Sequence, residues 1–370
     1  MTPDVMSRPA TDAVEPRTAE EAAEVIRDAA ANGVTLRIVG RGMWLEGGRP
    51  VKAQRVLSTR AMTGIVEYEP GDLTLTARAG TSLAEIAATT IPERQWLTLD
   101  PPGTDDGTLG ATAATASAGP LAHAFGLPRD AVLGIEIATG DGAVVRAGGR
   151  VVKNVAGFDL TRLFVGSWGT LGAITELTVR LRALPERDET VALPATTPTL
   201  ARLRANDLTP LAVERLSPPL ARHLGVDTTE PVVLVRLAGN TAAVASQRTI
   251  LGPDATPVPH DVWRTLRAVA PANAAIWRCS TRPADLARLY AETDDLWSHA
   301  TLSRGVVRCI ATAEIDARLT HHRTIATVIG EQLPPAAWPL LAPGPTSDRL
   351  SIAVKQTFDP AGILNPGIFG

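Results

Sequence analysis

Residues 108–119 read Thr-Leu-Gly-Ala-Thr-Ala-Ala-Thr-Ala-Ser-Ala-Gly, a run in which nearly every side chain is small. Small side chains let a backbone approach a flat ligand closely, and they leave amide and hydroxyl groups free to hydrogen-bond with it. The same run could equally form a tightly packed buried helix, because alanine is the best helix former. The run alone leaves both interpretations open, so the flanking sequence must decide between them.

Upstream of this run, a capping box that begins at Thr18 predicts a helix ending at Asn32-Gly33, followed by a strand over residues 34–39. The strand leads into Gly40-Arg41-Gly42-Met43-Trp44. A Rossmann site would need Gly-x-Gly-x-x-Gly opening a helix, but Leu45 takes the third glycine's place. An anion here would rest on the N–H groups of a turn. An ordinary strand-to-strand turn is the alternative interpretation of so short a motif.

Downstream, the sequence predicts many short strands, few long helices and several glycine-rich junctions. Gly140-Asp141-Gly142 separates two apolar stretches as a hairpin turn does, and a further strand follows Gly169-Thr170-Leu171-Gly172. This pattern indicates an α+β sheet domain over residues 16–184, after a tail at residues 1–15. From residue 185 to 349, strands near 231–237, 274–279 and 305–311 alternate with helical stretches near 241–250, 283–291 and 314–331, which predicts a smaller α+β domain.

Composition excludes several classes of protein. The chain has 370 residues, enough for two domains, and its net charge of −3 gives no basic excess for nucleic acid or anionic membranes. Its two cysteines, Cys279 and Cys309, lie in separate segments, which excludes a disulfide framework or a cysteine-ligated iron–sulfur cluster and fits a reducing compartment. No signal peptide or membrane-spanning stretch is evident. We therefore expect a soluble, cytoplasmic protein with at most peripheral membrane association through partners.

Five motifs in one order give the sequence a recognisable pattern. They are Gly40-Arg41-Gly42, the run 108–119, Lys153-Asn154-Val155-Ala156-Gly157-Phe158-Asp159-Leu160, Gly169-Thr170-Leu171-Gly172-Ala173-Ile174-Thr175-Glu176 and Phe358-Asp359-Pro360-Ala361-Gly362-Ile363-Leu364-Asn365-Pro366-Gly367. Together they resemble the FAD-binding E-type subunits of glycolate oxidases, in the vanillyl-alcohol oxidase superfamily. The resemblance covers most of residues 16–182 and 350–370.

The resemblance implies a fold and a cofactor. It implies a PCMH-type FAD-binding fold of two subdomains over 16–184, a cap over 185–349 similar to the C-terminal domain of FAD-linked oxidases, and a tail, 350–370, that returns to the FAD domain. Relatives with covalently attached flavin carry a histidine in the first loop, where this chain has Arg41-Gly42-Met43-Trp44. We therefore expect non-covalent FAD. Trp168 stands where the family pattern has glutamate or tyrosine, which could reshape the edge of the pocket.

The resemblance also implies which residues contact the cofactor. The first loop, with Gly40, Arg41, Gly42 and Met43, would hold the pyrophosphate. The small-residue run, with Thr108, Gly110, Ala111, Thr112 and Ser117, would lie along the pyrophosphate and the isoalloxazine, and Gly172 and Ile174 would contact the adenine end. The remaining expected cofactor-binding residues are Trp44, Pro102, Lys153, Asn154 and Gly157.

The sequence offers no clear catalytic residue in the cap. Catalytic relatives carry a histidine-rich metal motif and a Glu-His-Gly segment, and neither occurs here. His321 and His322 are adjacent on a predicted helix, so their side chains diverge by about 100° and cannot both ligate one ion; we predict no metal site. Oxidation of a 2-hydroxy acid needs a base or metal for the hydroxyl and a cation for the carboxylate. Arg215, Arg236, Arg278 and Arg308 are candidates for that cation, and the sequence does not choose among them.

Three functions remain open. In the first, the chain is an FAD-binding subunit that oxidises glycolate or D-lactate together with a catalytic flavoprotein subunit and passes electrons to an iron–sulfur subunit. In the second, it is a self-sufficient FAD-dependent 2-hydroxy acid dehydrogenase. In the third, it is a structural subunit with little flavin chemistry of its own. The missing metal motif favours the first and third.

Overall fold

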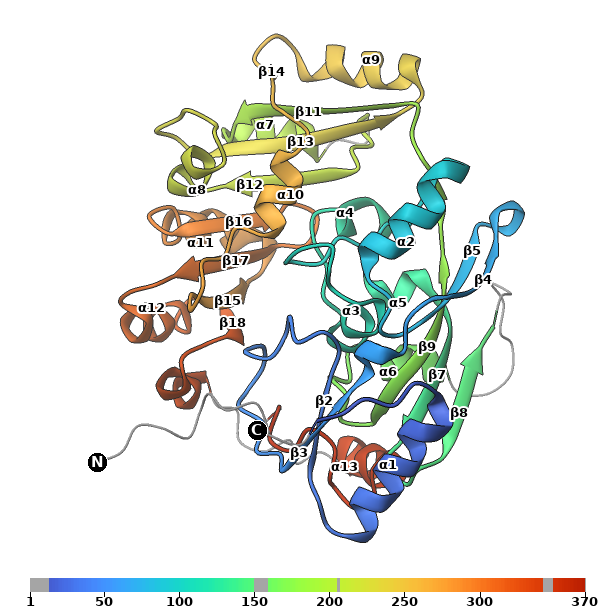
Figure 1. Cartoon of the computed structure of the whole chain (residues 1–370). Helices are drawn as coiled ribbons and strands as arrows, with labels where there is room; N and C mark the ends of the chain where they lie inside the picture. The colour runs from blue at the N-terminus through green and yellow to red at the C-terminus, as the bar shows by residue number, and fades with distance from the viewer. Residues whose placement is uncertain (1–12, 150–158, 205–206, 342–348, 370) are drawn as a thin grey trace.

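The computed structural model describes residues 13–149, 159–204, 207–341 and 349–369. Two large antiparallel sheets dominate it, one of five strands and one of eight, and Figure 1 shows them as separate bodies. A three-stranded parallel sheet and a two-stranded ladder complete the strand content. Helices pack on both large sheets, so the predicted α+β class is confirmed.

The first subdomain is built on the small parallel sheet, in the order β1-β3-β2. Its strands are β1 (Ala13–Val14), β2 (Leu36–Val39) and β3 (Arg55–Ser58). Helix α1 (Ala19–Ala31) covers this sheet with Ala22, Ile26 and Ala29, all fully buried. Thr18 caps the helix by accepting the N–H of Glu21, but the Glu21 carboxylate accepts the N–H of Arg17 rather than of Thr18. The predicted capping box is therefore only half formed.

The second subdomain is the five-stranded antiparallel sheet, in the order β4-β5-β9-β7-β8. Its strands are β4 (Ile65–Glu69), β5 (Thr74–Arg78), β7 (Val132–Thr139), β8 (Val144–Gly148) and β9 (Gly172–Arg180), and the ladder beside it pairs β6 (Gln95–Trp96) with β10 (Arg182–Ala183). The predicted hairpin is present, with Ala138 opposite Val144. Leu109, Phe164 and Leu177 are among the side chains of its core.

The cap is the eight-stranded antiparallel sheet, in the order β14-β11-β13-β12-β16-β17-β15-β18. Its strands are β11 (Arg187–Pro194), β12 (Ala212–Leu216), β13 (Val232–Gly239), β14 (Thr256–Pro257), β15 (Ala275–Ser280), β16 (Trp297–Thr301), β17 (Val306–Ala311) and β18 (Thr327–Gln332). Helices of the cap pack on both faces of this sheet. Because opposite residues of antiparallel neighbours share a face, His299 and Arg308 lie together on one of them, where they meet residues of the N-terminal half.

The remaining helices are short. In the first half they are α2 (Leu83–Thr90), α3 (Leu109–Thr115), α4 (Ala122–Phe125), α5 (Pro128–Ala131) and α6 (Leu160–Phe164). In the second half they are α7 (Thr197–Leu203), α8 (Pro218–His223), α9 (Thr241–Leu251), α10 (Val262–Arg267), α11 (Leu286–Ala291), α12 (Ile315–His322) and α13 (Arg349–Phe358), and 3₁₀ turns span η1 (Thr59–Ala61), η2 (Pro70–Asp72), η3 (Ile91–Glu93), η4 (Pro283–Asp285) and η5 (Pro335–Leu341). None of the described helices is long and apolar enough to cross a membrane.

The cap differs from the sequence prediction at two points. The helix expected over 314–331 ends at His322, and residues 327–332 form the edge strand β18, whose Thr327, Val328 and Ile329 are β-branched. Strands β11, β12 and β16 were missed because each carries charged or hydroxyl side chains between its apolar ones.

The segment after α13 returns to the first subdomain. Leu364 forms a parallel bridge with Leu36, and the N–H of Leu36 donates to the carbonyl of Ile363. The Asn365 side chain accepts the N–H of Ile38 at 2.8 Å and donates to the carbonyl of Trp168 at 2.6 Å. This segment therefore fixes β2 and the Trp168 turn to each other.

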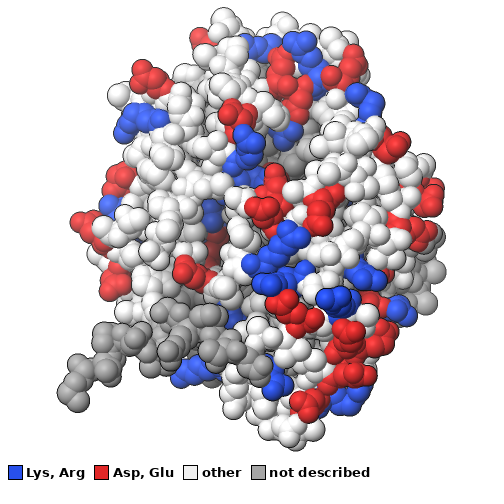
Figure 2. All heavy atoms as spheres, in the orientation of Figure 1, with Lys and Arg blue, Asp and Glu red and all other residues white. Residues whose placement is uncertain are grey.

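Figure 2 shows acidic and basic side chains interspersed over the face in view.

Candidate functional site

A cleft lies between the two subdomains of the N-terminal half, at the end of β2. Ten of the expected cofactor residues line it: Gly40, Arg41, Gly42, Met43, Trp44, Thr108, Gly110, Ala111, Gly172 and Ile174. They come from the loop after β2, from α3 and from the start of β9. Stretches far apart in the sequence thus meet in one cleft, as the sequence prediction requires.

The loop after β2 offers unused hydrogen-bond donors to this cleft. The backbone N–H groups of residues 40–44 make no hydrogen bond to any residue that the structure describes. Gly42 has a φ of +89°, a left-handed conformation that glycine adopts without strain. Successive free N–H groups in such a turn form a concavity that suits an anion, so the loop fits a diphosphate. Arg41 lines the same cleft and pairs with Glu85 at 2.9 Å.

Three glycines of the cleft are required by packing within the protein. A Cβ added at Gly40 would lie 2.6 Å from Oγ1 of Thr108, and one at Gly110 would lie 2.6 Å from Cβ of Ala79. At Gly172 it would lie 2.4 Å from Cγ2 of Ile137. Each distance is below ordinary van der Waals contact. The glycines therefore bring the walls of the cleft together. The prediction that a ligand approaches them closely remains a prediction.

The run 108–119 combines both interpretations that the sequence left open. Residues 109–115 form helix α3, which Thr108 caps by accepting the N–H of Ala111, and which ends at Ala116 with a φ of +49°. Leu109 and Ala113 are buried on one side of α3, in the core of the five-stranded sheet. Thr108 and Ala111 line the cleft. The run is a packed helix that also contributes one wall of the cleft.

Three other expected cofactor residues, Thr112, Pro102 and Ser117, do not line the cleft. Thr112 is buried, and its hydroxyl donates to the carbonyl of Thr108 at 3.0 Å, so it does not line the cleft. Pro102 does not line it either. Ser117 lines a neighbouring cavity. Lys153, Asn154 and Gly157 lie outside the described residues. Their cofactor roles remain predictions.

The cleft also contains residues that the sequence analysis did not select. Arg37 lines it from β2, and burial lowers the pKa of its guanidinium, which donates to the carbonyl of Leu45. Asn365 and Ile368 line it from the returning segment. Arg37 could have been selected from the sequence, because it is a charged residue within the strand that precedes the glycine loop. Asn365 belongs to a quoted motif, but only the fold reveals its place.

A second cavity, of about 270 Å³, adjoins the cleft on the side of the cap. That volume lies near the lower end of the range for small-molecule sites. The two hollows share Trp44, Thr115, Trp168 and Ile368 as lining residues. Trp168 has a φ of +53° and meets Trp44 edge to face, with ring centroids 6.0 Å apart. The tryptophan that departs from the family pattern thus stands at the border between the two hollows.

Arginines give the second cavity its positive charge. Arg278 and Arg308 lie 2.8 Å and 2.6 Å from the two carboxylate oxygens of Glu331. Burial raises the pKa of Glu331, but the attraction of Arg308 and Arg278 outweighs it and leaves the pKa below its ordinary value. Two of the four candidate arginines therefore line this cavity. Arg215 and Arg236 instead pair with Asp294 and Asp188, away from it.

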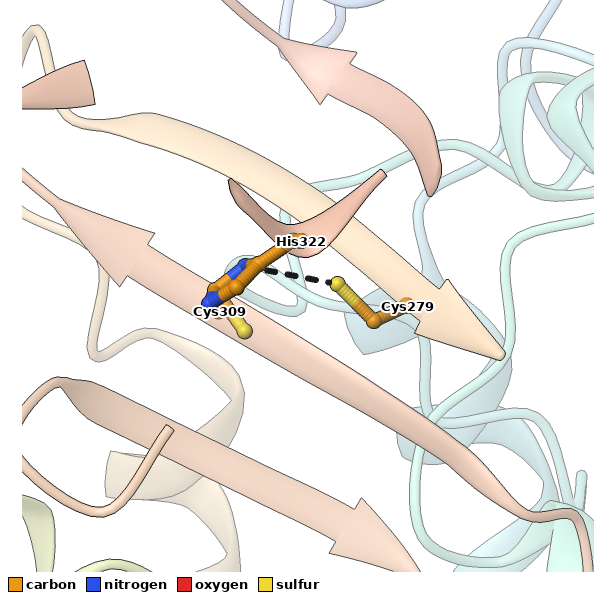
Figure 3. Close-up of side chains that lie close together, drawn as sticks. All are labelled: Cys279, Cys309 and His322. Carbon is orange, nitrogen blue, oxygen red and sulfur yellow. Dashed lines mark hydrogen bonds between the residues drawn. The ribbon is translucent and has the colours of Figure 1, made fainter. Parts of the chain in front are cut away.

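A second reactive cluster lies on the far face of the cap sheet. Cys279 on β15, Cys309 on β17 and His322 at the end of α12 place their ligand atoms within 4.8 Å of one another. Figure 3 shows the three side chains gathered together. The two cysteines, distant in sequence, are thus neighbours in space as free thiols. His322 is buried, whereas its neighbour His321 is exposed and pairs with Glu292.

Hydrogen bonds engage both ring nitrogens of the histidine in this cluster. The indole N–H of Trp277 donates to Nδ1 of His322 at 3.0 Å, and Nε2 lies 3.4 Å from the carbonyl of Glu292. A metal ion on Nδ1 would displace the Trp277 N–H and leave it buried without a partner, which costs about 1–3 kcal/mol. We therefore assign no metal to the cluster.

Comparison with known proteins agrees with this geometry. Residues 11–148 match a family model described as an FAD binding domain. The glycolate oxidase subunit GlcE of Escherichia coli (strain K12) is 31% identical over 357 residues, which cover 93% of this chain and 95% of that protein. The glycolate oxidase subunit GlcD of Bacillus subtilis (strain 168) is 32% identical over 225 residues, 59% of this chain and 47% of that protein. The chain therefore spans about half the length of GlcD.

A solved structure shows the same fold at greater sequence distance. An alkyldihydroxyacetonephosphate synthase superposes with a TM-score of 0.72 at 18% identity, over 96% of this chain and 76% of that one. This likeness supports the two-subdomain FAD fold with its cap. The resemblance inferred from the five motifs is confirmed, and FAD is the cofactor that the matched domain implies. The chain belongs to the family of the glycolate oxidase subunit GlcE, among the FAD-dependent oxidoreductases.

Proposed function

We propose that this chain binds FAD non-covalently in the cleft and takes part in oxidising a small 2-hydroxy acid, glycolate or D-lactate. It does so as one subunit of a glycolate oxidase-type complex. The names of its relatives, glycolate oxidase subunits GlcE and GlcD, support both the reaction and the assembly. A cytoplasmic location fits its two free, buried thiols.

The cofactor assignment follows the walls of the cleft. The free N–H groups of residues 40–44 would hold the pyrophosphate, helix α3 would lie along the pyrophosphate and isoalloxazine, and Gly172 with Ile174 would face the adenine. Residues 40–44 contain no histidine that could attach the flavin covalently. When bound, FAD supplies a two-electron acceptor. We also propose that residues 16–184 form the FAD domain, 185–349 the substrate cap and 350–370 the returning tail.

The single observation that carries the proposal is the shared border of the two hollows. A cleft with free backbone donors opens beside a cationic cavity, and Trp44, Thr115, Trp168 and Ile368 belong to both. An acid bound in the cavity would therefore lie against the cofactor. Such adjacency is what a redox reaction between a bound acid and a flavin requires.

The partner assignment follows from the electron balance. Two electrons leave the acid, and the chain has only two cysteines, too few for an iron–sulfur cluster held by four thiolates. We propose that an iron–sulfur subunit receives the electrons and that a larger catalytic flavoprotein subunit shares the complex. GlcD-type proteins, of which this chain matches 47%, are the kind of chain expected in that role.

The test is purification of the native complex, followed by measurement of FAD and iron in each separated subunit. We expect FAD on this chain, and bleaching of the flavin absorbance by glycolate or D-lactate only in the assembled complex. If the isolated chain bleaches fully, it is a self-sufficient dehydrogenase. If this chain carries no flavin in the native complex, it is a structural subunit and the proposal is wrong.

A further inference from the structure

We infer that the second cavity is the binding site for the 2-hydroxy acid, with Arg304 as the carboxylate anchor and His299 as the base that takes the hydroxyl proton. This inference rests on the proposed function and assigns its residues. Three features support it: the register of the cap sheet, the unpaired charge of Arg304 and the hydrogen bonds of His299.

Sheet register gathers the polar residues of this cavity on one face. His299 on β16 lies opposite Arg308 on β17, and Arg308 lies opposite Arg278 on β15. Directly opposed residues of antiparallel strands point to the same face, so the three side chains form a row across three strands. All three line the second cavity. The adjacent Cys279 and Cys309 belong to the opposite face, packed on α11 and α12.

Arg304 is the cation of the cavity that lacks an internal partner. It lies in the turn between β16 and β17 and is half-buried. Its guanidinium makes no ion pair or hydrogen bond with any residue in the described parts of the chain. Arg278 and Arg308 already share Glu331, which neutralises one of their two charges. The cavity therefore carries a net positive charge that a carboxylate would balance.

The surroundings of Arg304 also disfavour the charged form of its guanidinium. Burial and the nearby charge of Arg278 lower the pKa of its guanidinium. A carboxylate can accept two parallel N–H bonds from one guanidinium, a strong and directional pairing. A bound acid would thus satisfy the arginine that the protein itself leaves unpaired.

His299 is arranged as a base with one nitrogen already engaged. Its Nδ1 lies 2.8 Å from a carboxylate oxygen of Glu214, whose side chain is fully buried. The hydroxyl of Thr301 donates to the other oxygen of Glu214 at 2.5 Å. An ionised Glu214 can only accept, so in the neutral imidazole Nδ1 carries the hydrogen and Nε2 keeps the lone pair. Glu214 is therefore a positioning residue, because it fixes the tautomer.

The second nitrogen of His299 distinguishes this arrangement from a structural histidine. Nε2 is buried and has no hydrogen-bond partner among the described residues. A buried acceptor without a partner costs about 1–3 kcal/mol, and a purely structural histidine would be expected to satisfy both nitrogens. His299 lines the cavity, so a hydroxyl donor bound there would supply the missing partner.

The step balances with these groups and the cofactor. The hydroxyl O–H bond of the acid breaks and its proton moves to Nε2 of His299. The C2–H bond would break with its electron pair, for which bound FAD would supply the two-electron acceptor, and C2 and the oxygen would form the carbonyl of a 2-oxo acid. Arg304 keeps the carboxylate in place throughout, and His299 afterwards returns its proton to water.

Binding of oxalate tests the carboxylate anchor without turnover. Oxalate is a small dicarboxylate without an alcohol carbon, so it can bind but cannot be oxidised as the 2-hydroxy acid is. Calorimetry measures its Kd on the native complex and on the chain alone. We expect Arg304→Gln to weaken oxalate binding by about 10- to 100-fold, the effect of a lost charged hydrogen bond. Arg288→Gln is the matched control, because Arg288 is an exposed arginine on α11 that does not line the cavity.

The base is tested by separating binding from rate. In the complex, His299→Gln should keep its oxalate Kd and FAD content while flavin reduction by the acid slows by roughly 10²- to 10⁴-fold. Added imidazole should restore part of that rate. Glu214→Gln should lower kcat more than it raises KM. His223→Gln, at an exposed histidine stacked on Trp297, is the control.

The outcomes separate this inference from the proposed function. Equal oxalate affinity in wild type and Arg304→Gln, with both folded by circular dichroism, would remove Arg304 from the site while leaving the flavoprotein function intact. An undiminished rate in His299→Gln would remove the base. Absence of flavin from the wild-type chain would refute the function, yet the oxalate measurement would still decide the binding site. Should Arg304→Gln misfold, Arg304→Lys, which keeps the charge but not the fork, replaces it.

Discussion

At the scale of single residues, burial controls the ionisation of Asp100. Its carboxylate accepts the N–H of Leu121 at 3.0 Å, and Gly119 packs so closely on it that an added Cβ would lie 2.0 Å from the Asp100 carbonyl oxygen. Burial raises the pKa of Asp100 to about 7, against the opposing effects of the Leu121 N–H and of Arg267 and Arg236. Folding therefore favours the protonated acid.

This raised pKa predicts a pH dependence of stability. Between the unfolded value of 3.8 and about 7, the folded chain binds more protons at this site than the unfolded chain, so the site's contribution is full below 3.8 and is lost as the pH rises to 7. The free energy of unfolding should fall between about pH 5 and about pH 8, and we expect Asp100→Asn to reduce that fall by a few kcal/mol. Urea unfolding at the two pH values measures it. The exposed Asp106→Asn is the control. A slope identical to wild type in Asp100→Asn would assign the dependence to other groups.

Residues also show what the sequence could and could not predict. The loop 40–44 was identified because its glycines are adjacent in the chain and form a local motif. Arg304 and His299 carry no such motif, since their meaning depends on which strands neighbour β16. The strand order β12-β16-β17-β15 is not sequential, so no local pattern could place His299 beside Arg308 and Arg278.

At the scale of elements, helix α3 shows packing overriding propensity. Gly110 lies within α3, where alanine would be favoured by about 1 kcal/mol on propensity alone. An added Cβ would, however, meet Ala79 at three atoms, two of them backbone and the closest at 2.6 Å. Overpacking against a rigid neighbour typically costs about 1–3 kcal/mol. The clash should therefore exceed the gain.

We predict that Gly110→Ala lowers the free energy of unfolding by up to about 2 kcal/mol, the balance of these two effects. Chemical denaturation measures it, and flavin release from the native complex should become easier in parallel. The comparison is Gly71→Ala, where nothing lies within 4 Å of the added methyl. A stabilised Gly110→Ala would mean that α3 can shift away from β5.

Elements were predicted unevenly for a physical reason. Helix α1, capped by Thr18, and the β7–β8 hairpin follow from hydrogen bonds between near neighbours, and both are present. β18 was misread as helix because a short edge strand, with one apolar face and one exposed, has little periodic signal. Its strand form is fixed by pairing with β15, a partner some fifty positions away in the chain.

At the scale of the whole molecule, the cofactor is expected to stabilise the fold by mass action. A ligand that binds only the folded state adds about 2.7 kcal/mol at a concentration 100 times its Kd. Added FAD should therefore raise the Tm of flavin-depleted wild-type protein. Arg41→Glu should reduce that rise, because it places a second carboxylate beside Glu85 at the loop that faces the diphosphate.

The matched variant for this measurement is Glu85→Gln. It removes the ion-pair partner of Arg41 but leaves the arginine in place, so the FAD-dependent rise in Tm should persist. An Arg41→Glu protein with the same FAD-dependent rise as wild type would exclude Arg41 from the cofactor site.

The Asn365 side chain has a consequence for the order in which this protein acquires its shape. It joins Ile38 to a position 327 residues later, and its other hydrogen bond reaches back to Trp168. Closing so long a loop costs entropy that only an already organised chain can recover. The wall of the cleft that Asn365 and Ile368 supply should thus form late in folding, so that flavin is captured by a nearly native chain instead of acting as a nucleus for it.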